Sequence, residues 1–490
     1  MRRDPKPLRR SGRPRGAALA GLLAAGLACS RSAPPPRGPD VVLVTVESLR
    51  TDSVGAYGGA SPGRPEVPIT PNLDAFASGA TVYEDAHSVT SWTLASHASL
   101  FTGLYPSGHQ TTGPLDRLDD SVPTLAEVLA ARGYQTAGVV SGPYLRRTHN
   151  LSQGFEVYDQ EAASITSRLA HADVTNPAML VALERVLDRD RDPERPLFLF
   201  AYFWDPHFDY LPPPPWSTAF VPPGAEPFDA RDLDANPAIH AGMDAQRLAW
   251  LRAQYAGEIR WTDEHLGRFF ELLRQHGLWD DALVIVTADH GEAFFDHGGK
   301  GHKNGLYAEE VHVPLFVKYP GQGEGRRDAR LASLVDVLPT VLEAVGVAPD
   351  FPVHGRSLRA PDPDPERAVL FELETSRFTA GAAGVVRASR TFWQAIRRGE
   401  WKLVEWRDEG PGAAGPGRRL FRVTEDPAEA VDLADREPQR RDELERALAA
   451  AVGAARADGQ RYRRGGEAQL SAEEIERLRA LGYFAPAAEP

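Results

Sequence analysis

Acidic and imidazole side chains follow three apolar runs of the sequence, at the point where each run ends. These side chains are Glu47 after 41–46, Asp205 and His207 after 197–203, and Asp289, His290 and Glu292 after 282–288. A solvated loop charge would explain one such position, whereas three of them favour a shared site. Carboxylates that lie close together repel one another, so a cation is their natural partner. Mixed carboxylate and imidazole ligands suit Zn²⁺ or Mn²⁺ better than Ca²⁺ or Mg²⁺.

A hydroxyl-rich segment, SWTLASHASLFTGLYP at 91–106, is a second place where chemistry could occur. Its pattern predicts a short helix that starts near Thr93 and stops at Gly103. Thr93 or Ser91 would then lie at the helix N-terminus, where backbone N–H groups and the helix dipole favour an anion. A hydroxyl bound there to a metal loses its proton more easily and becomes a nucleophile. The alternative is that Thr93 only caps the helix.

Strands and helices must alternate along residues 40–355 to position these groups. Runs rich in β-branched and other apolar residues predict buried strands at 41–46, 136–140, 197–203, 282–288 and 313–319. Start and stop signals with helical spacing predict helices at 70–79, 124–133, 253–277 and 334–346, and Thr124 with Glu127 predicts a capping box at the start of the second of these. The alternation indicates a doubly wound, mostly parallel α/β sheet flanked by helices. In such sheets ligands bind beyond the carboxyl ends of the strands, where the acids and imidazoles of this chain fall.

The C-terminal part, residues 356–490, has a different pattern. Segments such as RTFWQAIRRGEWKLVEW alternate apolar and polar residues between turn signals, which predicts a small antiparallel sheet solvated on one face. A charged helix follows, and Ser471 with Glu474 predicts a capping box near the end of the chain. We interpret this region as a small C-terminal α+β subdomain, in which no chemistry is visible.

The N-terminal residues 1–29 indicate an export signal. A basic head precedes the apolar run AALAGLLAAGLAC, which is too short to span a bilayer comfortably, and the single cysteine, Cys29, ends that run. The stretch AAGLACS resembles a bacterial lipoprotein signal, which implies a lipidated Cys29, membrane attachment and a periplasmic or cell-envelope location. A plain secretory signal or an uncleaved anchor is the alternative. Residues 30–39 are predicted to be a Pro-rich linker.

The net charge of −13 argues against nucleic acid as the partner, because phosphate binding needs a basic surface. The single cysteine also excludes an internal disulfide framework.

Blocks spread over residues 40–355 resemble the sulfatases of the alkaline phosphatase superfamily. They include VVLVTVESLRTDSVGAYG, SHASLFTGLYPSGH, ADHGEAFFDHGG and GHKNGLYAEEVHVPLFVKYPG. The resemblance implies an alkaline phosphatase-like fold for residues 40–355 and the small C-terminal sheet that this family carries. It also implies activity on sulfate or phosphate esters.

The nucleophile position departs from the sulfatase pattern C-x-P-x-R, whose cysteine is converted to formylglycine. Thr93 stands at the cysteine, Ala95 at the proline and His97 at the arginine. Because threonine cannot become formylglycine, the sequence argues against a formylglycine mechanism. We expect His97 to bind a substrate oxygen in place of the arginine.

The metal positions depart from the sulfatase pattern as well. Glu47 and Ser48 replace two consecutive aspartates, and His290 stands where many sulfatases have asparagine. The set Glu47, Thr93, Asp289 and His290 resembles phosphoethanolamine transferases and lipoteichoic acid synthases. Those enzymes hold one Zn²⁺ or Mn²⁺ with Glu, Thr, Asp and His, and their threonine is the nucleophile.

The resemblance therefore implies one divalent ion, with Mn²⁺ or Zn²⁺ favoured and Ca²⁺ or Mg²⁺ possible, and a covalent Thr93 intermediate. His207, His302 and Lys303 resemble family positions that hold substrate oxygens or protonate the leaving group. The chain is thus predicted to be an exported hydrolase or transferase for phosphate or sulfate esters, with a small anionic ester substrate carried on a glycan or a lipid. The alternative is a non-catalytic domain that binds anionic glycans or lipids.

Overall fold

The computed structural model describes residues 38–162, 172–233, 235–360, 364, 366–381, 384–409 and 415–480. The predicted signal peptide and linker residues 30–37 lie outside this part of the chain. Within the described residues, no helix combines the length and apolar character that a bilayer crossing requires.

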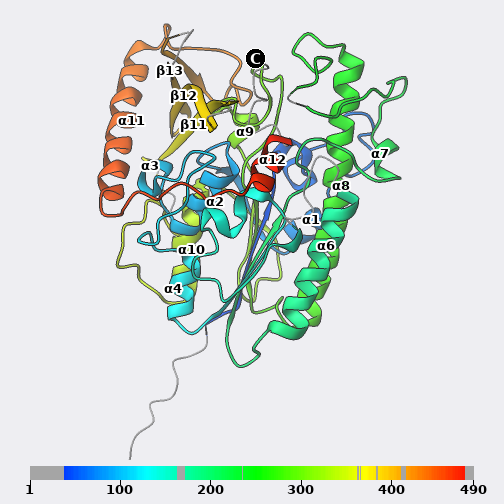
Figure 1. Cartoon of the computed structure of the whole chain (residues 1–490), viewed down its shortest axis with the longest axis vertical. Helices are drawn as coiled ribbons and strands as arrows, with labels where there is room; N and C mark the ends of the chain where they lie inside the picture. Colours follow the sequence, from blue (N-terminus) through cyan, green and yellow to red (C-terminus); the bar gives the residue numbers. More distant parts are fainter. Residues whose placement is uncertain are drawn as a thin grey trace, which may run out of the picture. The chain divides into compact units, whose positions relative to one another are not determined.

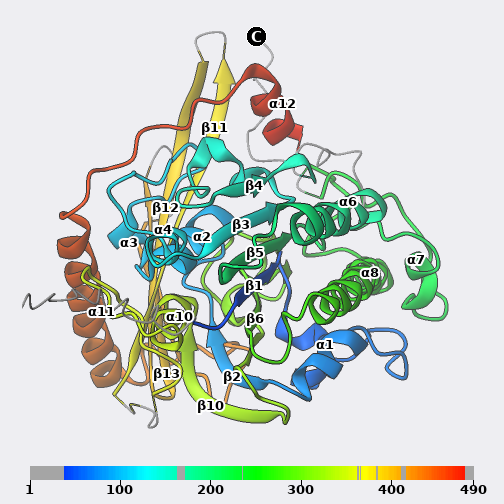
Figure 2. The ribbon, with the colours of Figure 1, turned by 90° about the horizontal axis from the view of Figure 1, so that it is seen from below.

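An eight-stranded sheet forms the centre of the unit Gly38–Pro490, in the order β10-β2-β9-β6-β1-β5-β3-β4. Its strands are β1 (Val41–Val46), β2 (Thr81–His87), β3 (Gln135–Val140), β4 (Val157–Asp159), β5 (Leu197–Phe203), β6 (Leu283–Ala288), β9 (Leu315–Lys318) and β10 (Arg326–Ser333). Figure 2 shows β1 in the middle of the sheet, between β5 and β6. β9 runs antiparallel to both of its neighbours, and the other pairings are parallel. The predicted, mostly parallel α/β sheet is therefore confirmed.

Helices cover both faces of this sheet. On one face lie α1 (Pro71–Ala77), α6 (Ala172–Arg185) and α8 (Ala245–Gln275), and on the other lie α2 (Thr93–Thr102), α4 (Leu125–Ala131) and α10 (Val337–Ala344), as Figure 1 shows. The capping box predicted from Thr124 and Glu127 is present at the start of α4. The Asp244 side chain accepts hydrogen bonds at the start of α8, so this helix begins eight residues before the predicted start.

A separate four-stranded antiparallel sheet follows in the C-terminal part, as predicted. It contains β11 (Ala368–Gly381), β12 (Gly384–Arg398), β13 (Trp401–Glu409) and β14 (Gly417–Arg422) in that order. The helix α11 (Pro438–Gly459) buries Leu444 and Leu448 with Ile396 and Leu403 of this sheet. The capping box of Ser471 and Glu474 begins α12 (Ala472–Ala480). The domain boundary near residue 355 stays a prediction.

The register of the central strands decides where the functional groups lie. Val46 of β1 is level with Ala288 of β6 and with Phe203 of β5. Because these strands are parallel, the residues that follow them emerge at the same edge of the sheet. β1, β5 and β6 are buried along their whole length, so this edge rests on a rigid support.

Candidate active site

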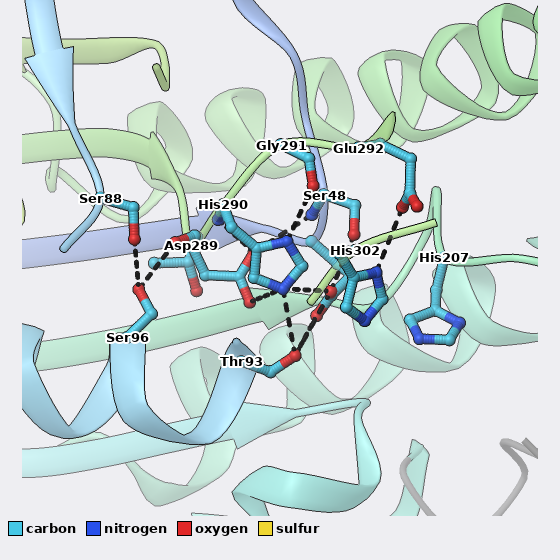
Figure 3. A network of polar contacts seen from close by, with 12 residues as sticks. Ser48, Ser88, Thr93, Ser96, His207, Asp289, His290, Gly291, Glu292 and His302 are labelled. Atoms are coloured by element: carbon cyan, nitrogen blue, oxygen red, sulfur yellow. Dashed lines mark hydrogen bonds and ion pairs between the residues drawn. The ribbon is translucent and has the colours of Figure 1, made fainter. Parts of the chain in front are cut away.

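A cluster of buried polar side chains lies at the carboxyl edge of the sheet (Figure 3). Glu47 follows β1, His207 follows β5, and Asp289 with His290 follows β6. Thr93 reaches the same place from α2, in the segment after β2. The structure therefore brings the predicted metal ligands together with the predicted nucleophile.

Thr93 is the first residue of α2, and its side chain is fully buried. Its Oγ1 lies 3.4 and 3.5 Å from the two carboxylate oxygens of Glu47 and 3.3 Å from Nε2 of His290. The N-cap residue of this helix is Trp92, and no side chain caps it. Thr93 is thus not the N-cap, and its hydroxyl is directed to the polar cluster.

The other hydroxyls of this segment point elsewhere. Ser91 donates to the carbonyl of Gly305 at 2.9 Å, and Ser96 donates to the carbonyl of Asp289 at 2.7 Å. Ser99 contacts Nε2 of His109 at 2.9 Å. Thr93 is therefore the hydroxyl of this segment that faces the ligand set.

Glu47 is the centre of the cluster. Its carboxylate accepts hydrogen bonds from the hydroxyl of Tyr202 and from Oγ of Ser48, the latter at 2.9 Å, and its Oε1 lies 3.1 Å from Nε2 of His290. Burial alone would raise the pKa of Glu47, but the charge and hydrogen bond of His290 hold that pKa well below its usual value. The carboxylate is thus ionised at neutral pH.

His290 and Asp289 complete the inner part of the cluster. Nδ1 of His290 donates to the carbonyl of Gly291 at 2.9 Å, which turns Nε2 towards Glu47. Burial lowers the pKa of His290, but the charges of Asp289 and Glu47 raise it to about 10 in the metal-free protein. Oδ1 of Asp289 accepts from the backbone N–H groups of Ser48 and His290, whereas its buried Oδ2 has no hydrogen-bond partner.

His302 presents a second unpartnered atom. Its Nδ1 donates to Oε2 of Glu292 at 3.4 Å, and its buried Nε2 has no hydrogen-bond partner. The ring centroid of His302 lies 4.5 Å from that of His290. Burial and the neighbouring charge of His290 hold the pKa of His302 well below its usual value, so the imidazole is neutral. A neutral imidazole with an open nitrogen is what a metal ligand requires.

These residues fit a single metal ion. One ligand atom each from Glu47, His290 and His302 lies within 4.8 Å of the others, and all three residues are buried. Oδ2 of Asp289, which has no hydrogen-bond partner and lies 3.7 Å from Nε2 of His290, supplies a further oxygen atom of the type that a metal ion would bind. His302, expected from the sequence to act on substrate, is thus also a candidate ligand.

His207 and Lys303 lie beside this cluster. The His207 ring stacks on Trp204 with centroids 3.9 Å apart, and its centroid lies 5.2 Å from that of His302. Burial lowers the pKa of His207 to about 3, so its imidazole is neutral near pH 7. Its Nδ1 donates to the carbonyl of Phe208 at 2.5 Å, which makes Nε2 a hydrogen-bond acceptor. Nζ of Lys303 lies 4.0 Å from the centre of the Trp92 ring.

His97 has a different environment from the one expected. Its Nδ1 donates to the carbonyl of Thr93, and its Nε2 accepts from Oγ1 of Thr45, both at 2.9 Å. Burial lowers its pKa to about 4, which keeps the imidazole neutral. Both ring nitrogens are therefore used within the protein, and this favours support of the first turn of α2 over the substrate contact predicted from the sequence.

The sequence did not indicate the supporting roles of Tyr202, Ser48 and Glu292. Tyr202 lies within the apolar run of β5, and its hydroxyl donates to Glu47. A buried tyrosine hydroxyl needs a hydrogen-bond partner, and this need is the one indication that the sequence offers. Ser48 has a positive φ of 52°, and no sequence pattern predicts this backbone conformation. The sequence shows Glu292 only as an acid after a strand. Its contact with His302 depends on the conformation of residues 299–307, which carry His302. Asp205 instead interacts with the buried Glu258 of α8.

Comparisons with known proteins agree with the observed fold. The model of the Sulfatase family matches residues 39–347. The multifunctional alkaline phosphatase superfamily protein PehA of Trinickia caryophylli is 26% identical over 393 residues, which cover 65% of this chain and 76% of that protein. The ulvan-active sulfatase of Formosa agariphila is 26% identical over 388 residues, which cover 73% of this chain and 72% of that protein.

A solved structure shows the same fold. The phosphonate monoester hydrolase of Agrobacterium radiobacter has a TM-score of 0.65 with this chain at 23% identity, and the match covers 85% of this chain and 96% of the other. At this identity the likeness establishes the architecture. The residues in the cluster must be judged from their own chemistry.

Proposed function

Because the chain belongs to the sulfatase family and is an ester hydrolase, we propose that it cleaves sulfate or phosphate esters with Thr93 as a covalent nucleophile. The position of the Thr93 hydroxyl between Glu47 and Nε2 of His290 carries this proposal. A hydroxyl in a buried site, close to an ionised carboxylate and to candidate metal ligands, has the surroundings that activate a weak nucleophile.

Four side chains of the cluster would each have a separate role in ester cleavage. Oγ1 of Thr93 forms a bond to phosphorus or sulfur as the bond to the leaving oxygen breaks, and a later attack by water, or by an acceptor molecule, releases the group. The carboxylate of Glu47 orients the hydroxyl of Thr93. Nε2 of neutral His207 would accept a hydrogen bond from a substrate hydroxyl, and the ammonium of Lys303 would hold substrate oxygens or give a proton to the leaving group.

The same cluster would hold one divalent cation through Glu47, Asp289, His290 and the newly recognised His302, with Mn²⁺ or Zn²⁺ preferred for the mixed oxygen and nitrogen ligands. Such an ion, when bound, would lower the pKa of the Thr93 hydroxyl and offset negative charge on the group that is transferred. His302 is suited to this role by its neutral state and by Glu292, which fixes the direction of its ring.

Anionic esters on glycans are the proposed substrates. The relatives include an ulvan-active sulfatase and an endo-4-O-sulfatase of Bacteroides thetaiotaomicron, which supports a sulfated saccharide. The threonine nucleophile favours phosphate esters or diesters instead. Turnover of aryl phosphate, phosphodiester and aryl sulfate with Mn²⁺ or Zn²⁺ decides between them, and turnover that survives Thr93→Ala would overturn the nucleophile.

Export is a further part of the proposal. The basic head, short apolar run and Cys29 support a lipoprotein anchored to the cell envelope. Labelling with radioactive palmitate should mark the wild-type protein and not Cys29→Ala. Equal labelling of both proteins would contradict lipidation of Cys29.

A further inference from the structure

A hairpin of two short strands joins Glu292 to His302. β7 (Ala293–Phe294) follows Glu292, β8 (Lys300–Gly301) precedes His302, and the two strands pair antiparallel. This pairing brings the two ends of the hairpin together, and Figure 3 shows the resulting contact between the side chains of Glu292 and His302. Any group that fixes the hairpin therefore also fixes His302 and its neighbour Lys303.

His297 lies in the turn of this hairpin, and its side chain is only 10% exposed. Nδ1 of its ring lies 2.8 Å from Oε1 of Glu309, and Nε2 lies 2.9 Å from the backbone carbonyl oxygen of Glu429. A carbonyl oxygen accepts hydrogen bonds and donates none, and the same holds for an ionised carboxylate. Both ring nitrogens must then carry a proton, so the two contacts require an imidazolium.

The surroundings of His297 stabilise this positive charge. Burial lowers the pKa of His297, but the hydrogen bonds to Glu309 and Glu429 and the negative charges of these two residues raise it above its ordinary value. The ring also stacks on Tyr307 with centroids 3.9 Å apart and planes 7° apart, and an aromatic face attracts a cation. Burial raises the pKa of Tyr307 to about 12, so that ring stays neutral.

Glu429 connects the hairpin to the C-terminal part of the chain. Besides the contact of its carbonyl with His297, its buried carboxylate accepts a hydrogen bond from Nζ of Lys402 in β13 at 2.7 Å. The same carboxylate accepts from the backbone N–H of the first residue of α9 (Ala308–Val311) at 3.1 Å, and α9 also supplies Glu309. The hairpin, α9 and the antiparallel sheet are therefore joined at one point.

Further charged groups pack around His297 from its own hairpin, from β13 and from β14. These groups are Asp296, which pairs with Arg50 and Arg252, Lys402, which pairs with Glu429, and Arg419, whose guanidinium carbon lies 5.8 Å from the centre of the Tyr307 ring. The ion pairs largely cancel their own charges, so the contact with Glu309 is the strongest electrostatic influence on the imidazole.

We propose that His297, as an imidazolium, is a positioning residue that fastens the hairpin to α9 and to Glu429 and thereby holds His302 and Lys303 at the catalytic cluster. Its effect on turnover rests on the proposed function, whereas its two protons and its two contacts do not. Loss of one proton at high pH leaves one acceptor without a donor and loosens the hairpin. The C-terminal part of the chain, through Glu429, then contributes to the geometry of the site.

The proton count is tested by nitrogen-15 NMR of the full-length, metal-free protein with labelled histidine. His297→Gln identifies the ring signals of His297 by their loss among those of the 14 histidines. We expect two protonated ring nitrogens near pH 7 and a titration midpoint above the ordinary value of about 6.5. Glu309→Gln, which keeps an oxygen acceptor and removes the charge, should lower that midpoint. One unprotonated nitrogen near pH 7, or a midpoint that Glu309→Gln leaves unchanged, would overturn the proposal.

The positioning role is tested on His302 itself in the same metal-free protein. The ring signals of His302, identified with His302→Gln, should shift or broaden in His297→Gln, because the hairpin that carries His302 has lost an anchor. His276→Gln is the matched control, since His276 also pairs with an acid, Asp188, but lies at the C-terminal end of α8. Midpoints of thermal unfolding show that both variants fold. Unchanged His302 signals in His297→Gln, or equal changes in the control, would contradict the positioning role.

Turnover gives a further readout that a purely structural role would not move. With an aryl ester that the wild-type protein cleaves, kcat/KM of the wild type should exceed that of His297→Gln about tenfold at pH values below the titration midpoint of His297. This ratio should fall towards equality above the midpoint, because the wild-type ring has then lost the proton that held its second acceptor. A ratio that does not change with pH would overturn the proposal. Absence of turnover with every ester would count against the proposed function, and the NMR measurements would then decide the role of His297.

Discussion

Oγ1 of Thr93 lies 3.3 Å from Nε2 of His290, although 197 positions separate the two residues in the chain. The parallel pairing of β1 with β6 brings His290 beside Glu47, and the turn into α2 brings Thr93 to both. Three loops that are distant in sequence therefore meet at one edge of the sheet.

The activity should not depend on formylglycine. Thr93 occupies the position of the modified cysteine, and the one cysteine of the chain, Cys29, lies far from it in sequence. Protein produced in a host that lacks the formylglycine-generating enzyme should have the same kcat as protein co-expressed with that enzyme. A large gain in kcat on co-expression would contradict an unmodified threonine.

Tyr202→Phe should weaken the site without unfolding it. The hydroxyl of Tyr202 donates to Glu47, and loss of such a supporting hydrogen bond typically costs 10–100-fold in metal affinity or activity. The measurement is Mn²⁺ or Zn²⁺ affinity together with kcat/KM. Tyr83→Phe is the control, because Tyr83 is also buried in the sheet but bonds to Tyr319. Equal losses in both variants would mean a general packing effect.

Glu292→Gln should disturb the site through His302. The carboxylate of Glu292 accepts from Nδ1 of His302 and so directs Nε2 into the cluster. We expect metal affinity to fall about tenfold or more, while the unfolding temperature of the metal-free protein changes little. Unchanged metal affinity would remove His302 from the proposed ligand set.

Glu310 should make stability depend on pH. Burial and the charge of Glu309 raise its pKa to about 8, above its value in the unfolded chain. Between these two pKa values the folded protein retains a proton that the unfolded chain releases, so stability falls as pH rises from 5 to 8, by at most about 1.4 kcal/mol per pH unit for this group.

Glu310→Gln keeps an acceptor for the backbone N–H of Asn304 and removes this titration. Urea unfolding at pH 5, 6, 7 and 8 should show the variant gaining stability over the wild type as pH rises. Glu343→Gln, at an exposed position of α10, should show a constant difference. A constant difference for Glu310→Gln would be inconsistent with the raised pKa.

Local signals in the sequence predicted much of this fold. The β-branched run at 41–46, the capping boxes of Thr124 and Ser471, and the stop at Gly103 all appear as expected. β2 and β10 were not predicted, because both mix charged with apolar residues. The antiparallel direction of β9 depends on the path of the chain between strands. The four residues of this strand, three apolar and one basic, do not predict its direction.

The positions of the candidate site residues in the fold were predictable where residues follow strands directly, as Glu47, Asp289 and His290 do. It was less predictable where side-chain contacts across the fold decide a role. His97 was expected to face substrate, yet its two nitrogens bond to Thr45 and Thr93. The role of His302 depends on Glu292 and on the conformation of the loop that carries it, and no residue spacing encodes either.

The central claim is that Thr93 carries the transferred group. The most direct measurement is mass spectrometry of the peptide that contains Thr93, after the wild-type protein and Thr93→Ala are quenched with acid during turnover of an aryl phosphate or aryl sulfate. We predict that the wild-type peptide gains the mass of one phosphoryl or sulfuryl group at Thr93, and that the variant gains none and loses turnover. An unmodified Thr93 together with full turnover by Thr93→Ala would contradict the account.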